Sequence, residues 1–207
     1  MIDRLITELD RGLKILSVKP TSCRPRPDLN ILETESLSTT NKKINAKYMR
    51  INHTGEVCAQ ALYRGQLFFN TNNKIKEELE KAADEEVDHL VWCDKRIQEL
   101  GGKTSKLNPI FYSGSFLLGA ITSAIDERYN LGFLAETEKQ VTKHLSNHLK
   151  QIDKSDKKTI KIIEAMRDDE EEHANSAIKM GAKNLHPAIK KFMGYASKVM
   201  TKTTFYI

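Results

Sequence analysis

Residues 86–89, Glu-Val-Asp-His, and residues 170–173, Glu-Glu-Glu-His, repeat one pattern, Glu-x-x-His, in the two halves of this chain. A single Glu precedes each copy, Glu56 by 30 residues in the first half and Glu138 by 32 residues in the second. Residues three apart share one face of a helix, so each motif directs a carboxylate and an imidazole toward the same point. Two such motifs with two further Glu residues, on four helices, are the ligand set of a two-metal carboxylate site inside a helix bundle.

Turn-forming residues lie midway between the two Glu residues of each half. Residues 71–73, Thr-Asn-Asn, interrupt the first half, and residues 153–156, Asp-Lys-Ser-Asp, interrupt the second. If each half is an antiparallel helical hairpin, its two Glu residues meet at the same depth, about 22 Å from the turn at about 1.5 Å per residue. The sequence therefore predicts two hairpins that bring all the candidate ligands to one level.

Each of these Glu residues also lies on the apolar face of its predicted helix. Around Glu86, for example, Leu79, Ala82, Cys93 and Ile97 recur at helical spacing. An ionised carboxylate on such a face needs a partner, because burying it alone is costly or shifts its pKa. A buried Glu–His or Glu–Arg pair would account for one motif, but not for four helices with two matched spacings. A pair of cations accounts for all four carboxylates together.

The residue types favour iron. Structural zinc sites use Cys and His in a closed tetrahedron, whereas carboxylates dominate this set. Four Glu and two His suit a pair of iron ions, with manganese as the second choice. The predicted fold is all-α, a ferritin-like four-helix bundle with amphipathic or apolar flanking helices. Its six candidate metal ligands are Glu56, Glu86, His89, Glu138, Glu170 and His173.

The residues around these ligands resemble a known family. Residues 49–56 (MRINHTGE) and 63–66 (YRGQ) are similar to segments of the demethoxyubiquinone hydroxylases of ubiquinone biosynthesis, in their bacterial form. The same holds for three further segments, residues 86–90 (EVDHL), 135–141 (AETEKQV) and 166–174 (MRDDEEEHA). The resemblance runs from about residue 45 to the C-terminus. Ferritins and ribonucleotide reductases do not share the phrase that ends at Glu56.

The resemblance implies both the chemistry and the role of each ligand. It implies an O2-dependent di-iron monooxygenase that hydroxylates a polyprenylated methoxy-methyl-benzoquinol, demethoxyubiquinol, with the second oxygen atom leaving as water. By this resemblance Glu56 and His89 would bind one iron, Glu138 and His173 the other, and Glu86 and Glu170 would bridge both. An external reductant is also implied. If it is NAD(P)H, the chain has no recognisable motif for it, since no Gly-rich loop follows a strand pattern.

One departure limits the comparison with the animal members. These carry His-Tyr where this chain has His144 and Leu145, so a role for that tyrosine does not transfer. The roles of three other histidines stay open. His53, three residues before Glu56, is a candidate for orienting a ligand. His144 and His148 either border the site or face solvent.

Composition agrees with a single-domain protein of a reducing compartment. A chain of 207 residues can bury a full bundle core. No signal peptide is expected, because acidic residues interrupt the only apolar stretch near the start. The cysteines are odd in number and lack C-x-x-C spacing, which argues against disulfides and thiolate metal sites: Cys23, Cys58 and Cys93.

The predicted domain division places residues 1–43 outside the bundle and residues 44–207 within it. Residues 2–17 have apolar side chains at helical spacing, and residues 18–43 are rich in Pro, Ser, Thr and Asn, as in a flexible tether. Residues 107–125 contain no charge but are too short and mixed for a confident membrane span. Residues 186–207 form a basic amphipathic helix.

These last two segments predict a peripheral membrane contact, although both could also pack on the bundle as ordinary flanking helices. A net charge of +5 suits an anionic membrane, and the chain lacks a nucleic-acid motif or an Arg-rich stripe. We therefore expect a polyprenyl quinol substrate, other ubiquinone-biosynthesis proteins as partners, and a place on the cytoplasmic face of the inner membrane. Two alternatives share part of the pattern: an iron-handling ferroxidase or store, and a non-catalytic membrane-bound scaffold of the pathway.

Overall fold

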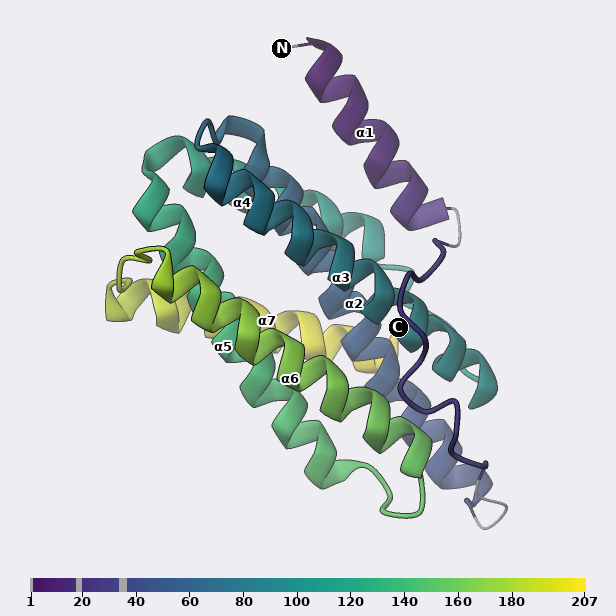
Figure 1. Ribbon diagram of the computed structural model, residues 1–207. Helices are drawn as coiled ribbons and strands as arrows, with labels where there is room; N and C mark the ends of the chain where they lie inside the picture. The colour runs from purple at the N-terminus through teal and green to yellow at the C-terminus, as the bar shows by residue number, and fades with distance from the viewer. Residues whose placement is uncertain (1, 18–19, 34–36) are drawn as a thin grey trace.

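The computed structural model describes residues 2–17, 20–33 and 37–207, and the described chain is all-helical, as predicted. Seven helices follow one another in these ranges. Their bounds are α1 Ile2–Ser17, α2 Thr39–Phe69, α3 Asn73–Glu99, α4 Asn108–Ile125, α5 Glu127–Gln151, α6 Lys157–Lys179 and α7 Pro187–Tyr206. Helices α2, α3, α5 and α6 form the bundle, and the other three lie on its outside (Figure 1).

Two antiparallel hairpins, α2–α3 and α5–α6, build the bundle (Figure 1). The first turns between Phe69 and Asn73, where the Asn72 side chain accepts hydrogen bonds from the first backbone N–H groups of α3. The second turns between Gln151 and Lys157, where Asp156 caps α6 in the same way. These caps satisfy N–H groups that the helix itself cannot pair. Both predicted turns are confirmed.

The long connection between the two hairpins contains α4, which packs along α2. Gly65 of α2 and Gly119 of α4 permit this close approach. A Cβ atom at Gly65 would clash with the carbonyl oxygen of Phe116, and one at Gly119 with that of Leu62. Any larger side chain at either position would therefore separate the two helices. On its outer side α4 exposes apolar residues, Ile110, Leu117, Leu118, Ile121 and Ile125.

Helix α7 crosses the bundle against α2 and α5 (Figure 1). Ile189 and Met193 pack against a cluster that includes Leu62 and Phe133, and Lys190 pairs with Glu136 at 3.0 Å. Its opposite face exposes Phe192, Tyr195, Val199 and Tyr206. None of the helices in the described ranges is both long enough and apolar enough to cross a membrane.

The predicted N-terminal helix is confirmed over residues 2–17, but the middle of its apolar stripe faces solvent. Ile6, Leu9 and Leu13 are all more than half exposed. Contact with the bundle runs instead through residues near the end of α1, where Ile15 and Leu16 pack against a cluster that includes Tyr112 of α4.

Residues 20–33, which we call the strap, have no regular secondary structure, in line with their prolines. The strap is nevertheless held against the bundle by ion pairs. Arg26 pairs with the buried Asp28 and with Glu99 of α3, and Glu33 accepts two hydrogen bonds from the fully buried Arg96. The predicted division at residue 43 stays a prediction; α2 itself begins at Thr39, with Ser38 as its N-cap.

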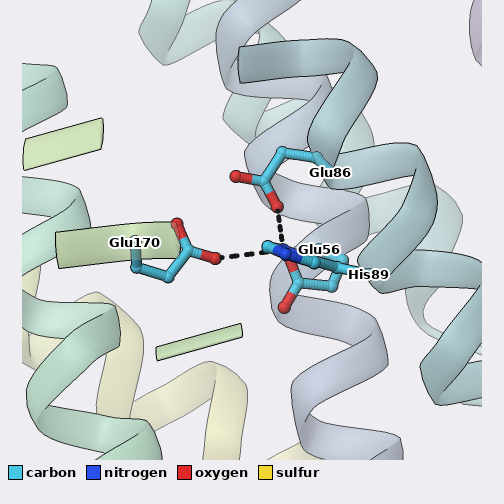
Figure 2. Close-up of side chains that lie close together, drawn as sticks. All are labelled: Glu56, Glu86, His89 and Glu170. Atoms are coloured by element: carbon cyan, nitrogen blue, oxygen red, sulfur yellow. Dashed lines mark hydrogen bonds and ion pairs between the residues drawn. The ribbon is translucent and has the colours of Figure 1, made fainter. Parts of the chain in front are cut away.

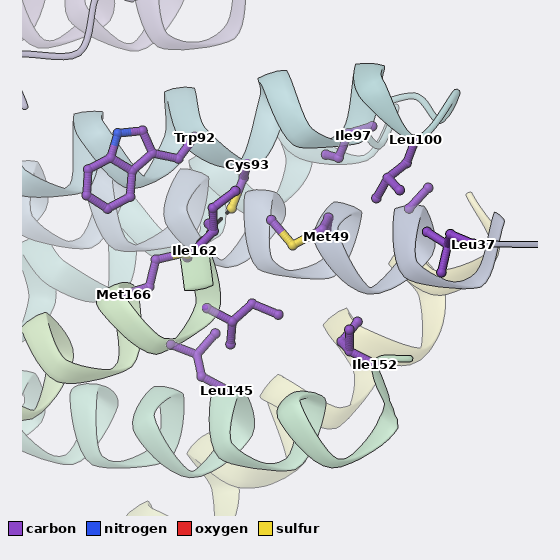
Figure 3. Packing of buried hydrophobic residues seen from close by; sticks show 12 residues of the cluster. Leu37, Met49, Trp92, Cys93, Ile97, Leu100, Leu145, Ile152, Ile162 and Met166 are labelled. Atoms are coloured by element: carbon purple, nitrogen blue, oxygen red, sulfur yellow. Dashed lines mark hydrogen bonds between the residues drawn. The ribbon is translucent and has the colours of Figure 1, made fainter. Parts of the chain in front are cut away.

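Two apolar clusters fill the bundle, one toward each end. One contains Met49, Trp92, Cys93, Leu145 and Met166, together with the residues around them (Figure 3). The other contains Tyr63, Leu67, Leu79, Leu134 and Ala177. In all four helices the predicted ligands lie between the residues of these two clusters, so the bundle encloses a polar layer between two apolar ones.

Candidate metal centre

All six predicted ligands point into this polar layer and are buried. Helix α2 supplies Glu56, α3 supplies Glu86 and His89, α5 supplies Glu138, and α6 supplies Glu170 and His173. The least buried of them, His173, is only 7% exposed. Four of the six offer ligand atoms that all lie within 4.8 Å of one another (Figure 2): Glu56, Glu86, His89 and Glu170.

The inner ring nitrogen of His89 faces three carboxylates. Its Nδ1 lies 3.0 Å from Glu86 Oε2, 3.4 Å from Glu170 Oε1 and 3.8 Å from Glu56 Oε2. Figure 2 shows Glu86 and Glu170 reaching toward this imidazole from α3 and α6. One imidazole and three carboxylates from three helices thus surround a single point.

The inner nitrogen of His173 faces the other carboxylate oxygens of Glu86 and Glu170, which we call the two central Glu residues. Its Nδ1 lies 3.4 Å from Glu86 Oε1 and 3.4 Å from Glu170 Oε2. Glu138 completes this side, and the Tyr63 hydroxyl donates a hydrogen bond of 2.9 Å to its Oε1. Glu86 and Glu170 therefore each have one oxygen toward His89 and one toward His173, which is the placement that bridging ligands require.

Two acidic residues that the sequence pattern did not single out hold the outer nitrogens of the histidines. His89 Nε2 lies 2.8 Å from Asp169 Oδ2, and His173 Nε2 lies 2.6 Å from Glu85 Oε2. Each of these acids directly precedes a central Glu and reaches the histidine of the other hairpin. A metal-binding imidazole commonly has such a carboxylate on its second nitrogen, which fixes the ring and raises its basicity. The sequence signal that could have identified these two partners is the acidic residue directly before Glu86 and before Glu170.

The charges in the layer strongly perturb one another. Burial and the neighbouring charge of Glu86 raise the pKa of Glu56, while burial and the charges of Glu170 and Glu86 raise the pKa of Glu138. Burial opposes ionisation of Glu86 as well, but the charge of His89 and hydrogen bonds from both histidines hold its pKa well below the usual value. In the same way the carboxylates outweigh burial and raise the pKa values of His89 and His173.

Without a cation the inner face of the layer is incompletely paired. Within the described residues, four of its buried donor and acceptor atoms have no hydrogen-bond partner of ordinary geometry: Glu86 Oε1, Glu138 Oε2, Glu170 Oε2 and His173 Nδ1. Leaving such atoms unpaired in a buried site is costly. All four belong to predicted ligands, and Glu86 Oε1 and Glu170 Oε2 each lie 3.4 Å from His173 Nδ1. The residues present therefore fit a carboxylate-rich two-metal site, as the donor types suggest.

The other histidines lie outside this ligand cluster. His53 is buried beside Asn108, and burial lowers its pKa to about 4. His148 Nδ1 donates a 2.7 Å hydrogen bond to Asn52 Oδ1, and its ring packs edge-on against that of His144, with 3.9 Å between the ring centres. Both of the latter line a surface hollow of about 270 Å³ between α2, α5 and α7, together with aromatic residues such as Phe205. At this hollow His144 is half-buried and His148 is buried, and the two predicted alternatives, bordering the site or facing solvent, stay open.

Known proteins share this ligand-bearing sequence along its whole length. The family described as "Ubiquinone biosynthesis protein COQ7" matches residues 43–204. A protein of Legionella pneumophila (strain Paris) named 3-demethoxyubiquinol 3-hydroxylase is 49% identical over 208 residues, covering 100% of this chain and 97% of the relative. Proteins with the same name from Chromobacterium violaceum and Ectopseudomonas mendocina are 45% and 47% identical, covering 100% of this chain and 100% and 96% of the relatives.

The matched region begins in α2 and ends in α7, so it contains both hairpins and all six predicted ligands. This agrees with the resemblance seen in the short motifs around Glu56 and His173. The chain belongs to the family of the ubiquinone biosynthesis protein COQ7.

Proposed function

We propose that this protein is a di-iron monooxygenase that hydroxylates demethoxyubiquinol in ubiquinone biosynthesis. The main observation in support is the buried layer in which four Glu and two His from four helices converge. Several of their oxygen and nitrogen atoms have no hydrogen-bond partner there. Family membership and the names of the relatives support the substrate and the reaction.

In this proposal Glu56 and His89 would hold one iron, Glu138 and His173 would hold the other, and Glu86 and Glu170 would be shared by both. The bound iron pair would supply the activation of dioxygen, with electrons from an external reductant. The placement of each Glu86 and Glu170 oxygen toward a different histidine supports the bridging assignment.

The protein itself orients the candidate ligands and keeps water out of the layer. Asp169 and Glu85 orient the two imidazoles, and the Tyr63 hydroxyl orients Glu138. The apolar clusters on either side exclude water, which strengthens every electrostatic contact in the layer. A bound quinol would therefore meet a preorganised, shielded centre rather than a hydrated one.

The proposal includes a peripheral contact with an anionic membrane, since a polyprenyl quinol is too apolar to arrive through water. The exposed apolar face of α4 and that of α7 support this contact. On α7 the contact residues are Phe192, Tyr195 and Val199, whereas Met193 packs on the bundle. Lys191, Lys198 and Lys202 accompany this face and would add roughly 1 kcal/mol each near an anionic surface. The cytoplasmic face of the inner membrane is the proposed location.

One experiment tests the reaction. The iron-loaded protein is reduced without oxygen, mixed with O2 and a demethoxyubiquinol analogue, and the analogue is examined by mass spectrometry. We expect a product heavier by one oxygen atom, with the label coming from ¹⁸O2 and not from water. A Glu86→Ala/Glu170→Ala variant serves as the control without the centre. Oxygen consumption that leaves the analogue unchanged would instead favour an iron-handling protein.

A further inference from the structure

Arg24 links the strap to both helices that carry a Glu-x-x-His motif. Its Nε donates to Asp88 Oδ2 of α3 at 2.8 Å, and its Nη2 donates to Asp169 Oδ2 of α6 at 2.8 Å. The same Nη2 lies 3.3 Å from the outer nitrogen of His89. Arg24 therefore contacts the histidine and the carboxylate that holds it.

The backbone around Arg24 is fixed at this place by α3. Asp88 Oδ1 accepts hydrogen bonds from the Ser22 hydroxyl and from the Cys23 backbone N–H. The Trp92 indole donates to Ser22 Oγ at 3.2 Å, and the Arg24 guanidinium lies 5.0 Å from the centre of the Trp92 ring. A planar guanidinium with two divergent N–H groups can satisfy both Asp88 and Asp169; a lysine ammonium cannot reach both in this way.

The opposite side of the centre has a different arrangement. Glu85, which holds His173, has Lys81 as its cationic neighbour, with Nζ 3.9 Å from Oε1 on an exposed helical turn. Exposed pairs of this kind contribute little. Asp169 is held by a forked guanidinium that is itself anchored in the strap, whereas the one Lys or Arg that pairs with Glu85 among the described residues is the loosely placed Lys81. The two otherwise matched histidines thus differ in how firmly their outer partners are held.

We propose that Arg24 is a positioning residue for the His89 half of the centre, holding Asp169 and through it the His89 imidazole, so that the two metal positions are inequivalent. This inference rests on the proposed two-metal centre. The strap then does more than cover the bundle: it sets the affinity of one metal position and leaves the other unchanged.

Equilibrium binding of Co²⁺ to the metal-free protein, followed by its visible absorption under anaerobic conditions, tests the inference without any turnover. Two single-position backgrounds separate the halves: His173→Ala leaves the position at His89, and His89→Ala leaves the position at His173. Adding Arg24→Gln should weaken Co²⁺ binding about 10- to 100-fold in the first background, the range for loss of a partner that orients a ligand. In the second background binding should change by less than about two-fold on the same basis.

Three variants make the test specific. Arg26→Gln removes the strap's ion pairs with Asp28 and Glu99 but touches neither Asp169 nor His89, so it should leave both positions unchanged. Arg24→Lys keeps the charge without the fork and should behave like Arg24→Gln. Arg24→Gln should add no further loss to Asp169→Asn. Circular dichroism confirms that each variant remains helical.

Several outcomes would overturn the inference. These are equal effects in both backgrounds, tighter binding in Arg24→Gln, wild-type binding in Arg24→Lys, or an Arg26→Gln variant that matches Arg24→Gln. A wild-type protein that binds no Co²⁺ would overturn the two-metal centre itself, and with it this inference. Two binding positions that are indifferent to Arg24 would overturn the inference alone.

Discussion

The α2–α3 and α5–α6 hairpins each supply one Glu and one Glu-x-x-His to the centre, but they meet different surroundings. The His89 imidazole is backed by Asp169, which Arg24 ties to the strap. The His173 imidazole is backed by Glu85, beside the exposed Lys81. Among the carboxylates inside the layer, the His173 side has the additional support, because Glu138 accepts a hydrogen bond from the buried Tyr63 hydroxyl. A repeated sequence pattern therefore does not give the two histidines equal surroundings.

This difference has a simple origin in the fold. The two hairpins present the same residue types at the same depth, but the strap reaches Asp169 of α6 through Arg24, and within the described residues no arginine reaches Glu85 of α3 in the same way. The symmetric part comes from helical spacing, and the asymmetric part comes from segments that follow no repeat. The predictions below test where the symmetry holds and where it ends.

The largest effect should come from the two central residues, at which the hairpins are equivalent. Glu86→Ala and Glu170→Ala should each lose most of the iron, because each removes a ligand that faces both histidines; the wild type should hold about two irons per chain. The measurement is iron per chain after anaerobic loading. Glu171→Ala, at the exposed neighbour on α6, is the matched control. Full iron occupancy in the double variant would rule out the di-iron assignment.

Glu56 and Glu138, the single Glu of each hairpin that precedes its Glu-x-x-His motif, should matter less for metal content than Glu86 and Glu170 do. Both should nevertheless be needed for turnover. Glu56→Ala and Glu138→Ala should retain part of the iron, because both central ligands remain, yet be nearly inactive. Tyr63→Phe should weaken metal binding only on the Glu138 side, since its hydroxyl donates to that carboxylate. Iron content and product formation are measured for all three. Equal iron loss in Glu56→Ala and Glu86→Ala would contradict the distinction between terminal and bridging ligands.

The outer partners of the histidines should give an intermediate effect. Asp169→Asn and Glu85→Gln should each lower metal affinity about 10- to 100-fold, because each loosens one imidazole. Asp169→Asn should have the larger effect, since it also frees Arg24. Competition with a chelator measures the affinities. Identical losses in the two variants would show that the backing carboxylates are equivalent despite Arg24.

The metal-free protein should be most stable in mildly acidic solution. The pKa values of Glu56, Glu138, His89 and His173 are raised on folding, so the stability they contribute is present at low pH and is lost as pH rises through the folded values. The lowered pKa values of Glu85, Glu86 and Asp169 act in the opposite sense, so their contribution is lost as pH falls. The same holds for the histidines outside the cluster, whose pKa values burial lowers: His53, His144 and His148.

Because an unfolded histidine titrates near pH 6.5, the melting temperature of the metal-free protein should peak at about pH 6 and decline above about pH 6.5, where the groups with raised pKa values still lose stability. Bound iron should remove this decline, since it binds the ionised ligands. Melting curves between acid and neutral pH, with and without iron, measure both. A melting temperature of the metal-free protein that climbs steadily to pH 8 would contradict the pairing described for the buried layer.

The smallest effect concerns the outer helices, α4 beside α2 and α7 across α2 and α5. Phe192→Ser/Tyr195→Ser should weaken binding to anionic liposomes and lower turnover of long-chain quinols more than that of short soluble analogues, with iron content unchanged. Added salt should weaken the contact of α7, which is basic, and not that of the uncharged α4. Met193→Ser is the contrasting control because Met193 packs on the bundle and should affect stability. Equal losses on both substrates would refute a membrane role for this face.

The convergence of the six candidate ligands could be predicted from the sequence because spacing along a helix determines which residues share a face. The apolar stripes around Glu56, Glu86, Glu138 and Glu170 placed those carboxylates inside, and turn residues at 71–73 and 153–156 placed them at one depth. The same reasoning found the bounds of α1. It did not find that Leu9 and its neighbours on α1 face solvent, because periodicity defines a face without naming what covers it.

Only the tertiary structure decided which residues meet across helices. Asp169 reaches His89 and Glu85 reaches His173 because the rotation and offset of α3 against α6 place them there, and these depend on the packing of the whole core. Arg24 reaches the centre from 65 residues before His89, through a strap without helical repeat. Local spacing thus determined the ligands of each hairpin, whereas long-range packing determined the partners that make the two halves of the centre different.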